Sequence, residues 1–241
     1  MRVINDAGHG ETDGGASGYG FIEKYLTLEA SQYVNDRLNE LGIESTQTRT
    51  SDVGLDSKVR TNIVKSSGAK VCLSHHYNAF NGKASGVETI YSIYSDDKLA
   101  RSIAYAIRDI GQPFRRVFSK KGTNGDYYYM HRLTGAVKTI IIEYAFLDNV
   151  DDAKRIKDKD YRFSMYEAVV KVMCEYFDVQ YTPLSGFSDV SNSHWAFNAI
   201  ENVFNDGIMI GMSDGLFKPN DLITRAEVAV IVNRIINKLS K

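Results

Sequence analysis

Two histidines and two glutamates, in separate segments of this 241-residue chain, are the residues best suited to chemistry. His9 lies in the glycine-rich segment DAGHG, His76 lies in SHHYN, and Glu23 lies between them. Two imidazoles and a carboxylate are the ligand set of an open catalytic zinc site, which keeps its fourth position for water. Glu143 follows an apolar run and can carry a proton. These residues predict metal-assisted hydrolysis.

Taken singly, each of these residues has a simpler interpretation. His9 can be a turn residue, His76 a polar group at the end of a strand, and Glu23 a solvated helix residue. Their joint occurrence near the ends of predicted strands favours the metal site. His75 is the nearest rival ligand. Because side chains alternate along a strand, only one of the two adjacent histidines can face the site.

The elements that must position these residues alternate between strand and helix. Short apolar runs predict strands at 2–5, 43–49, 70–74, 86–94 and 137–144. Apolar residues at helical spacing predict helices at 23–41, 55–66, 97–110 and 160–177. We expect 115–132 to be a surface loop. This order predicts an α/β fold with a mostly parallel sheet and helices on both faces, and the site at the carboxyl ends of the strands.

The composition changes near residue 180. We expect a catalytic domain at 1–178, a linker at 179–186 and a small helical domain at 187–241. The second domain contains the only tryptophan, Trp195, and has helical spacing at 196–204 and 225–239. Thr224 and Glu227 form a predicted capping box at the start of the last helix. About 55 residues make a marginal core.

Composition excludes several classes of protein. A net charge of -1 gives no electrostatic basis for binding nucleic acid, and no apolar stretch is long enough to cross a bilayer. The two cysteines, Cys72 and Cys174, lie in apolar surroundings and are expected to be core residues. His131 and His194 have no ligand partner at a suitable spacing, and we expect both to be surface groups.

Four motifs resemble the zinc-dependent N-acetylmuramoyl-L-alanine amidases of the amidase-3 family. They are DAGHG at 6–10, EK at 23–24, SHHYNA at 74–79 and IEYAFLDN at 142–149. The resemblance spans roughly residues 2–178 and implies that His9, Glu23 and His76 bind zinc, which selects His76 over His75. It implies that Glu143 is catalytic, and that the substrate is the amide joining N-acetylmuramic acid to L-alanine in peptidoglycan.

The chain departs from this family pattern at a few positions. Glu11 stands where glycine is usual, and Val64 and Lys65 stand near the position of a usual Ala-Asn pair. Since neither position is a ligand, these departures concern loop detail and substrate fit.

The C-terminal segment resembles a surface-layer homology domain through FSDV at 187–190, HWA at 194–196, DGLFKP at 214–219 and ITRAE at 223–227. The resemblance implies binding of anionic secondary cell-wall polysaccharide. Arg225 near a helix start suits a carboxylate, and Trp195 can pack against a sugar. In the plainer alternative, Trp195 is a core aromatic and Arg225 pairs with Glu227 or another acid. Such domains usually occur in threes, so one copy implies weak binding or a homotrimer.

These features together predict a peptidoglycan hydrolase that its C-terminal domain directs to the Gram-positive wall. The start of the chain, MRVINDAGHG, has no signal-peptide pattern. We therefore expect a protein made in the cytoplasm that acts at the wall after release, as a phage endolysin or a mother-cell lytic amidase would. The alternatives are a zinc peptidase acting on stem peptides and an inactive wall-binding protein.

Overall fold

The computed structural model describes residues 1–182, 186–187, 189–190, 194–212 and 215–239. The chain divides into two compact units, Met1–Tyr181 and Thr182–Lys241. The linker predicted at 179–186 spans this division, and its residues 183–185 lie outside the described part. The domain boundaries at 178 and 187 stay predictions.

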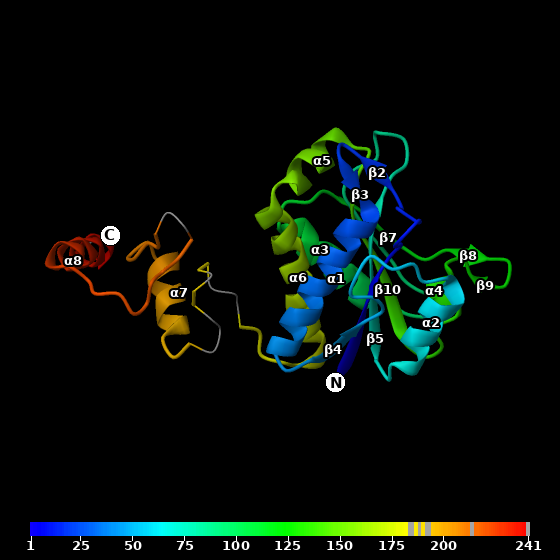
Figure 1. Ribbon diagram of the computed structural model, residues 1–241, viewed down its shortest axis with the longest axis horizontal. Coiled ribbons are helices and arrows are strands. Elements are labelled where there is room, and N and C mark those ends of the chain that lie inside the picture. The colour runs from blue at the N-terminus through cyan, green and yellow to red at the C-terminus, as the bar shows by residue number, and fades with distance from the viewer. Residues whose placement is uncertain (183–185, 188, 191–193, 213–214, 240–241) are drawn as a thin grey trace. The chain divides into compact units, whose positions relative to one another are not determined.

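A six-stranded sheet forms the centre of the first unit (Figure 1). Its strands, in spatial order, are β4 (Glu44–Gln47), β1 (Arg2–Ala7), β5 (Val71–Asn78), β10 (Lys138–Phe146), β6 (Val87–Ile90) and β7 (Phe114–Phe118). The first four are mutually parallel, β6 runs antiparallel to β10, and β7 runs parallel to β6. The predicted, mostly parallel sheet is confirmed.

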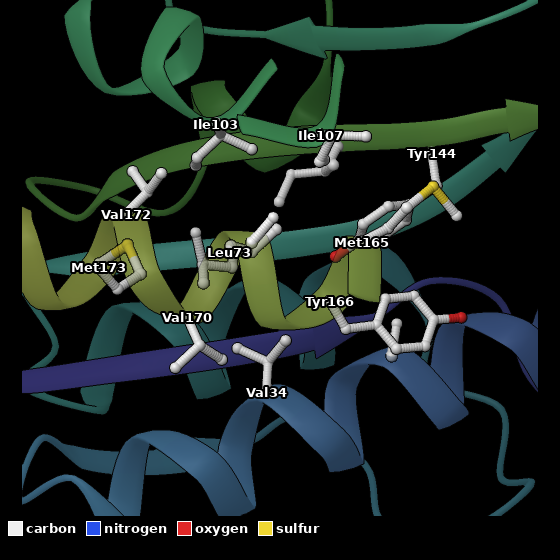
Figure 2. Packing of buried hydrophobic residues seen from close by; sticks show 14 of the residues in the cluster. Val34, Leu73, Ile103, Ile107, Tyr144, Met165, Tyr166, Val170, Val172 and Met173 are labelled. Carbon is white, nitrogen blue, oxygen red and sulfur yellow. The ribbon is translucent and has the colours of Figure 1, made fainter. Parts of the chain in front are cut away.

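Helices cover both faces of this sheet, as predicted (Figure 1). On one face lie α1 (Glu23–Glu40), α3 (Lys98–Asp109) and α6 (Lys159–Phe177), and on the other lie α2 (Ser57–Ser66) and α4 (Tyr129–Arg132). Figure 2 shows the larger core, in which Val34 of α1, Ile103 of α3 and Val170 of α6 share one cluster with Leu73 of β5. A smaller core beneath α2 and α4 contains Ile4, Val64, Cys72, Met130 and Ile141.

The central strand β10 shows why its sequence is apolar throughout. Ile140 and Ile142 enter the larger core, whereas Ile141 enters the smaller one. Side chains of a strand alternate between the two faces of a sheet, and here each face is covered by helices. A run of three isoleucines is therefore buried on both sides.

The prediction of a surface loop at 115–132 is wrong. This stretch contains most of β7, the short strands β8 (Lys121–Gly122) and β9 (Gly125–Asp126), and α4. The strand β7 reads FRRVF, and its adjacent arginines conceal the usual alternation of apolar and polar residues. His131, predicted to be a surface group, is 8% exposed because it lies in α4 against the smaller core.

Two further elements were not predicted. The ribbon formed by β2 (Ser17–Gly18) and β3 (Phe21–Ile22) lies within the loop that joins β1 to α1. The short helix α5 (Val150–Lys157) precedes α6, and Asn149 caps it by accepting hydrogen bonds from two backbone N–H groups. It is only eight residues long, shorter than the window of about 11 residues over which apolar periodicity predicts a helix.

The described residues of the second unit form two helices, α7 (Phe197–Asn205) and α8 (Arg225–Leu239). A small core of Phe187, Val190, Phe197 and Ile200 packs around α7. The capping box at the start of α8 is confirmed: Glu227 Oε2 accepts from the Thr224 N–H at 2.7 Å, and Thr224 Oγ1 accepts from the Glu227 N–H at 3.2 Å.

Trp195 is not the core aromatic of this unit. The residue is 91% exposed, and its indole ring stacks beside His194, with ring centroids 5.9 Å apart. Within the described part of the chain, no helix is both long and apolar enough to span a bilayer.

Candidate metal centre and active site

The carboxylate of Glu23 lies between two imidazoles. Its Oε1 atom is 3.1 Å from His9 Nε2 and 2.8 Å from His76 Nδ1. One donor atom from each of these three residues falls within 4.8 Å of the other two. Two imidazole nitrogens and one carboxylate oxygen at this spacing suit a zinc ion that keeps an open fourth position. The structure thus brings together the three candidate ligands that the sequence singled out.

Three separate elements supply these donors. His9 follows the end of β1, His76 lies near the end of β5, and Glu23 is the first residue of α1. Backbone groups fix the carboxylate of Glu23, because its Oε2 accepts from the Ala16 N–H at 2.6 Å and its Oε1 accepts from the Tyr77 N–H at 3.0 Å. Burial opposes ionisation, but hydrogen bonds from His76 and His9 lower the pKa of Glu23 to about 2. The carboxylate is therefore charged at neutral pH, the form that binds a cation.

His9 has an orienting partner of its own. Its φ is 61°, in the left-handed region, and its Nδ1 lies 2.8 Å from Asp13 Oδ2. A histidine whose second ring nitrogen contacts a carboxylate has a fixed ring orientation and is a more basic metal ligand. The contact with Asp13 leaves His9 Nε2 directed at Glu23.

Beneath the DAGHG loop, two buried arginines hold three consecutive carbonyl groups. Arg60 donates to the His9 carbonyl at 2.8 Å and to Asp6 Oδ1 at 2.7 Å. Arg49 donates to the carbonyls of Ala7 and Gly8 at 3.0 and 2.9 Å. Asp6 is fully buried, and its ion pair with Arg60 satisfies both charges. These contacts fix the backbone from which His9 projects.

Two glycines leave space for the side chains of two candidate ligands. A Cβ atom added to Gly8 would lie 2.2 Å from His76 Cε1, so the imidazole of His76 occupies the space that a side chain would need. A Cβ on Gly15, whose φ is +67°, would lie 2.4 Å from Glu23 Oε2. Both positions require glycine because the backbone passes directly against His76 or Glu23.

Glu143 on β10 lies directly beside His76 on β5 in the sheet register. Its Oε2 atom is buried and has no hydrogen-bond partner among the described residues. Burial raises the pKa of Glu143 to about 7, and the nearby carboxylates of Glu23 and Glu88 add to this rise while His76 opposes it. A carboxyl group with a pKa near neutrality can both accept and donate a proton at physiological pH.

His75 faces away from this site. Its Nδ1 lies 2.9 Å from the Tyr144 hydroxyl, and its Nε2 lies 3.0 Å from Asn5 Oδ1. Burial lowers its pKa to about 3, so the ring is neutral. The alternation expected along the strand therefore places His76, and not His75, against Glu23.

Glu11, which stands where the amidase-3 pattern usually has glycine, adopts a backbone conformation that glycine favours. Its φ is 54°, and both of its backbone polar groups are held. Its N–H donates to Asp52 Oδ1 at 2.7 Å, and its carbonyl accepts from Lys24 Nζ at 2.7 Å. Lys24, which follows the candidate ligand Glu23, thus ties the loop to α1.

The two predicted wall-binding residues lie in the second unit. Trp195 precedes α7, and Arg225 is exposed at the first turn of α8. The alternative pairing of Arg225 with Glu227 is not formed, since the Glu227 carboxylate caps Thr224 instead.

The sequence matches two known protein families, one over each unit of the chain. The sequence pattern of the N-acetylmuramoyl-L-alanine amidase family matches residues 3–175, well over half of the chain, and this range includes all four residues of the site. The chain belongs to this amidase family. The pattern of the S-layer homology domain matches residues 186–229, within the second unit.

Several family members can be compared directly. The sporulation-specific N-acetylmuramoyl-L-alanine amidase of Bacillus subtilis is 30% identical over 193 residues, which are 79% of this chain and 73% of that protein. The amidase LytC of the same organism is 28% identical over 69% of this chain, which spans only 34% of LytC. The crystal structure of an N-acetylmuramoyl-L-alanine amidase from Clostridium difficile 630 has a TM-score of 0.67 at 25% identity, covering 73% of this chain and 96% of that one.

Proposed function

We propose that this protein hydrolyses the amide between N-acetylmuramic acid and L-alanine in peptidoglycan, and that its C-terminal unit directs it to the cell wall. The main support is the cluster of His9, Glu23 and His76 beside Glu143. All four residues lie inside the range matched by the amidase family. Incubation with a purified muropeptide tests it, because this cleavage alone releases a peptide that begins with L-alanine. Cleavage within the peptide would instead support a peptidase.

We further propose that His9, Glu23 and His76 hold a zinc ion. The donor set supports zinc because it combines two imidazoles with one ionised carboxylate within 4.8 Å. Zinc bound there would supply Lewis-acid activation of a water molecule and of the amide carbonyl. His9 and His76 keep 24% and 20% of their side chains exposed, so substrate can reach the donors within this unit.

Glu143 is the proton carrier in this proposal. Glu143 lies beside His76 on the neighbouring strand, and its buried Oε2 has no hydrogen-bond partner among the described residues. Its raised pKa of about 7 allows it both to accept and to donate a proton. It takes a proton from the attacking water and gives one to the nitrogen of L-alanine, since an amine leaves far more readily than an amide anion.

Asp13→Asn is expected to lower zinc affinity by about 10- to 100-fold, because the charged partner of His9 Nδ1 is lost while the shape is kept. Competition with a chelator of known affinity measures the change. Asp109→Asn, at an exposed acid on α3, is the control and should leave zinc affinity unchanged. Equal affinity in wild type and Asp13→Asn would show that Asp13 does not orient the ligand.

We propose that Trp195 and Arg225 bind the wall polysaccharide, since both are exposed and each suits one part of an anionic sugar. Trp195→Ala and Arg225→Gln are each expected to weaken binding to purified walls about tenfold, the loss of one charge-assisted or stacking contact. A sedimentation assay measures this binding, with Tyr176→Ala and Arg108→Gln as controls in the first unit. Unchanged binding after removal of both residues would contradict the assignment.

We propose that three chains associate through α8. None of its described residues is buried, and Val228, Val232 and Ile236, spaced four residues apart on one face, are 43%, 47% and 55% exposed. An apolar stripe of this kind is stabilised when another surface covers it. Light scattering should give three times the chain mass of 27.0 kDa, and Val232→Glu should give a monomer while Asn237→Glu does not. A monomeric wild type at micromolar concentration would contradict the trimer.

A further inference from the structure

A row of charged residues crosses four neighbouring strands of the sheet. His76 on β5 pairs with Glu143 on β10, Glu143 pairs with Glu88 on β6, and Glu88 pairs with Arg116 on β7. Residues paired across neighbouring strands project from the same face of a sheet. The row therefore extends from the proposed zinc ligand, past the proton carrier, to the last strand of the sheet.

A β-bulge adds a second arginine to this row. The register between β6 and β7 pairs Val87 with Phe114 but Glu88 with Arg116, so Arg115 is an extra residue on β7. In a regular strand, Arg115 and Arg116 would face opposite sides, but a bulge re-aims one of them. Both guanidinium groups reach Glu88 Oε1, with their Nε atoms at 2.5 and 2.7 Å.

This arrangement leaves a net positive charge with unused donors. Glu88 is 1% exposed and neutralises only one of the two guanidinium groups. Each arginine donates its Nε–H to Glu88. The terminal guanidinium nitrogens of both arginines have no acceptor among the described residues. The side chains of Arg115 and Arg116 are 32% and 51% exposed, so an anion from solvent can reach them.

The two arginines are also held in place. Arg115 lies over the ring of Phe146 at 5.1 Å, and Arg116 lies over the ring of Phe118 at 4.0 Å. The other oxygen of Glu88 accepts from Asn78 Nδ2 at 3.2 Å, which ties the cluster to β5 two residues after His76. A fixed pair of guanidinium forks with free N–H groups is the arrangement that binds a carboxylate through two parallel hydrogen bonds.

We propose that Arg115 and Arg116 form a carboxylate-binding subsite for the stem peptide, next to the scissile amide. The inference rests on the proposed amidase function. On the sugar side of that amide the substrate is neutral, because the carboxyl group of muramic acid is consumed in the amide and the amino sugars are acetylated. The peptide side carries free carboxylates, the nearest being the α-carboxylate of the isoglutamate that follows L-alanine. The arginine pair therefore selects for the peptide and for its charge.

The test compares two muropeptides that differ in one group. Both carry N-acetylmuramic acid, L-alanine and the second peptide residue, which is isoglutamate with a free α-carboxylate in one and the corresponding carboxamide in the other. We expect the wild type to favour the carboxylate substrate in kcat/KM by roughly tenfold, the effect of one charge-assisted contact. Arg115→Gln and Arg116→Gln should each bring this ratio toward one, mainly through KM, and Arg116→Lys should keep part of the preference.

Arg108→Gln is the matched control, since Arg108 is an exposed arginine on α3 paired with Asp109. It should keep the wild-type ratio. A wild type that cleaves both substrates equally well would overturn the subsite and leave the amidase function standing. Equal losses on both substrates in the arginine variants would show that the pair only supports Glu88, and would also overturn it. Cleavage of neither substrate by the wild type would reject the amidase function and the subsite together.

Discussion

Glu143→Gln is expected to lower kcat by about 10²- to 10⁴-fold, the usual contribution of a general acid–base group. Glutamine fills the same space beside His76 but can neither accept the proton of water nor return it to the departing amine. The three proposed zinc ligands are unchanged, so the variant should bind zinc as the wild type does. Steady-state cleavage of a soluble muropeptide, together with metal analysis of the same sample, measures both quantities.

Glu175→Gln, at an exposed glutamate on α6, is the matched control and should keep full activity. Two outcomes would remove Glu143 from its assigned role. One is activity of Glu143→Gln within a few-fold of the wild type. The other is loss of zinc in parallel with activity, which would make Glu143 a structural support of the metal site.

Gly8→Ala is expected to weaken zinc binding by at least about 100-fold. The new Cβ would lie 2.2 Å from His76 Cε1 and 2.6 Å from His76 Nε2, so the imidazole must leave its place beside Glu23. Loss of a support outside the ligand set already costs 10- to 100-fold in affinity, and here a proposed ligand itself is displaced. Equilibrium dialysis with zinc, followed by the thermal midpoint of the metal-free protein, separates loss of the metal from loss of the fold.

Gly14→Ala is a close control because it lies in the same loop. The nearest side-chain atom to its added Cβ is Ile22 Cγ2 at 3.4 Å, an ordinary contact. This variant should bind zinc like the wild type. Normal zinc binding by Gly8→Ala would mean that the His76 ring does not need the position seen here.

The three proposed ligands could be found from sequence because histidine and glutamate are few near the predicted strand ends and their chemistry is specific. Alternation along β5 limited the choice between His75 and His76 to one, and the structure places His76 against Glu23. The main strands and helices were predictable for a similar reason, since apolar periodicity marks surfaces that must be buried.

What supports the ligands could not be predicted in the same way. Arg49 and Arg60 donate hydrogen bonds to the backbone carbonyls of Gly8 and His9. Arginine is usually exposed, and the sequence alone does not show that these two are buried, because their burial depends on tertiary contacts. The strand β7 was not predicted because the bulge at Arg115 places two arginines in succession. This interrupts the alternation of apolar and polar residues on which strand prediction depends. The exposure of Trp195 likewise depends on packing within the second unit, since an isolated tryptophan suits a core or a surface equally well.

Digestion of purified Gram-positive peptidoglycan, with the released ends identified by mass spectrometry, tests the proposed zinc amidase activity most directly. Three samples are compared: wild type, wild type chelated and then restored with zinc, and Glu143→Gln. A zinc amidase should produce new L-alanine amino termini that disappear on chelation, return with zinc and are nearly absent with Glu143→Gln. New termini at any other peptide bond, or L-alanine termini that persist in the chelated protein, would contradict this activity.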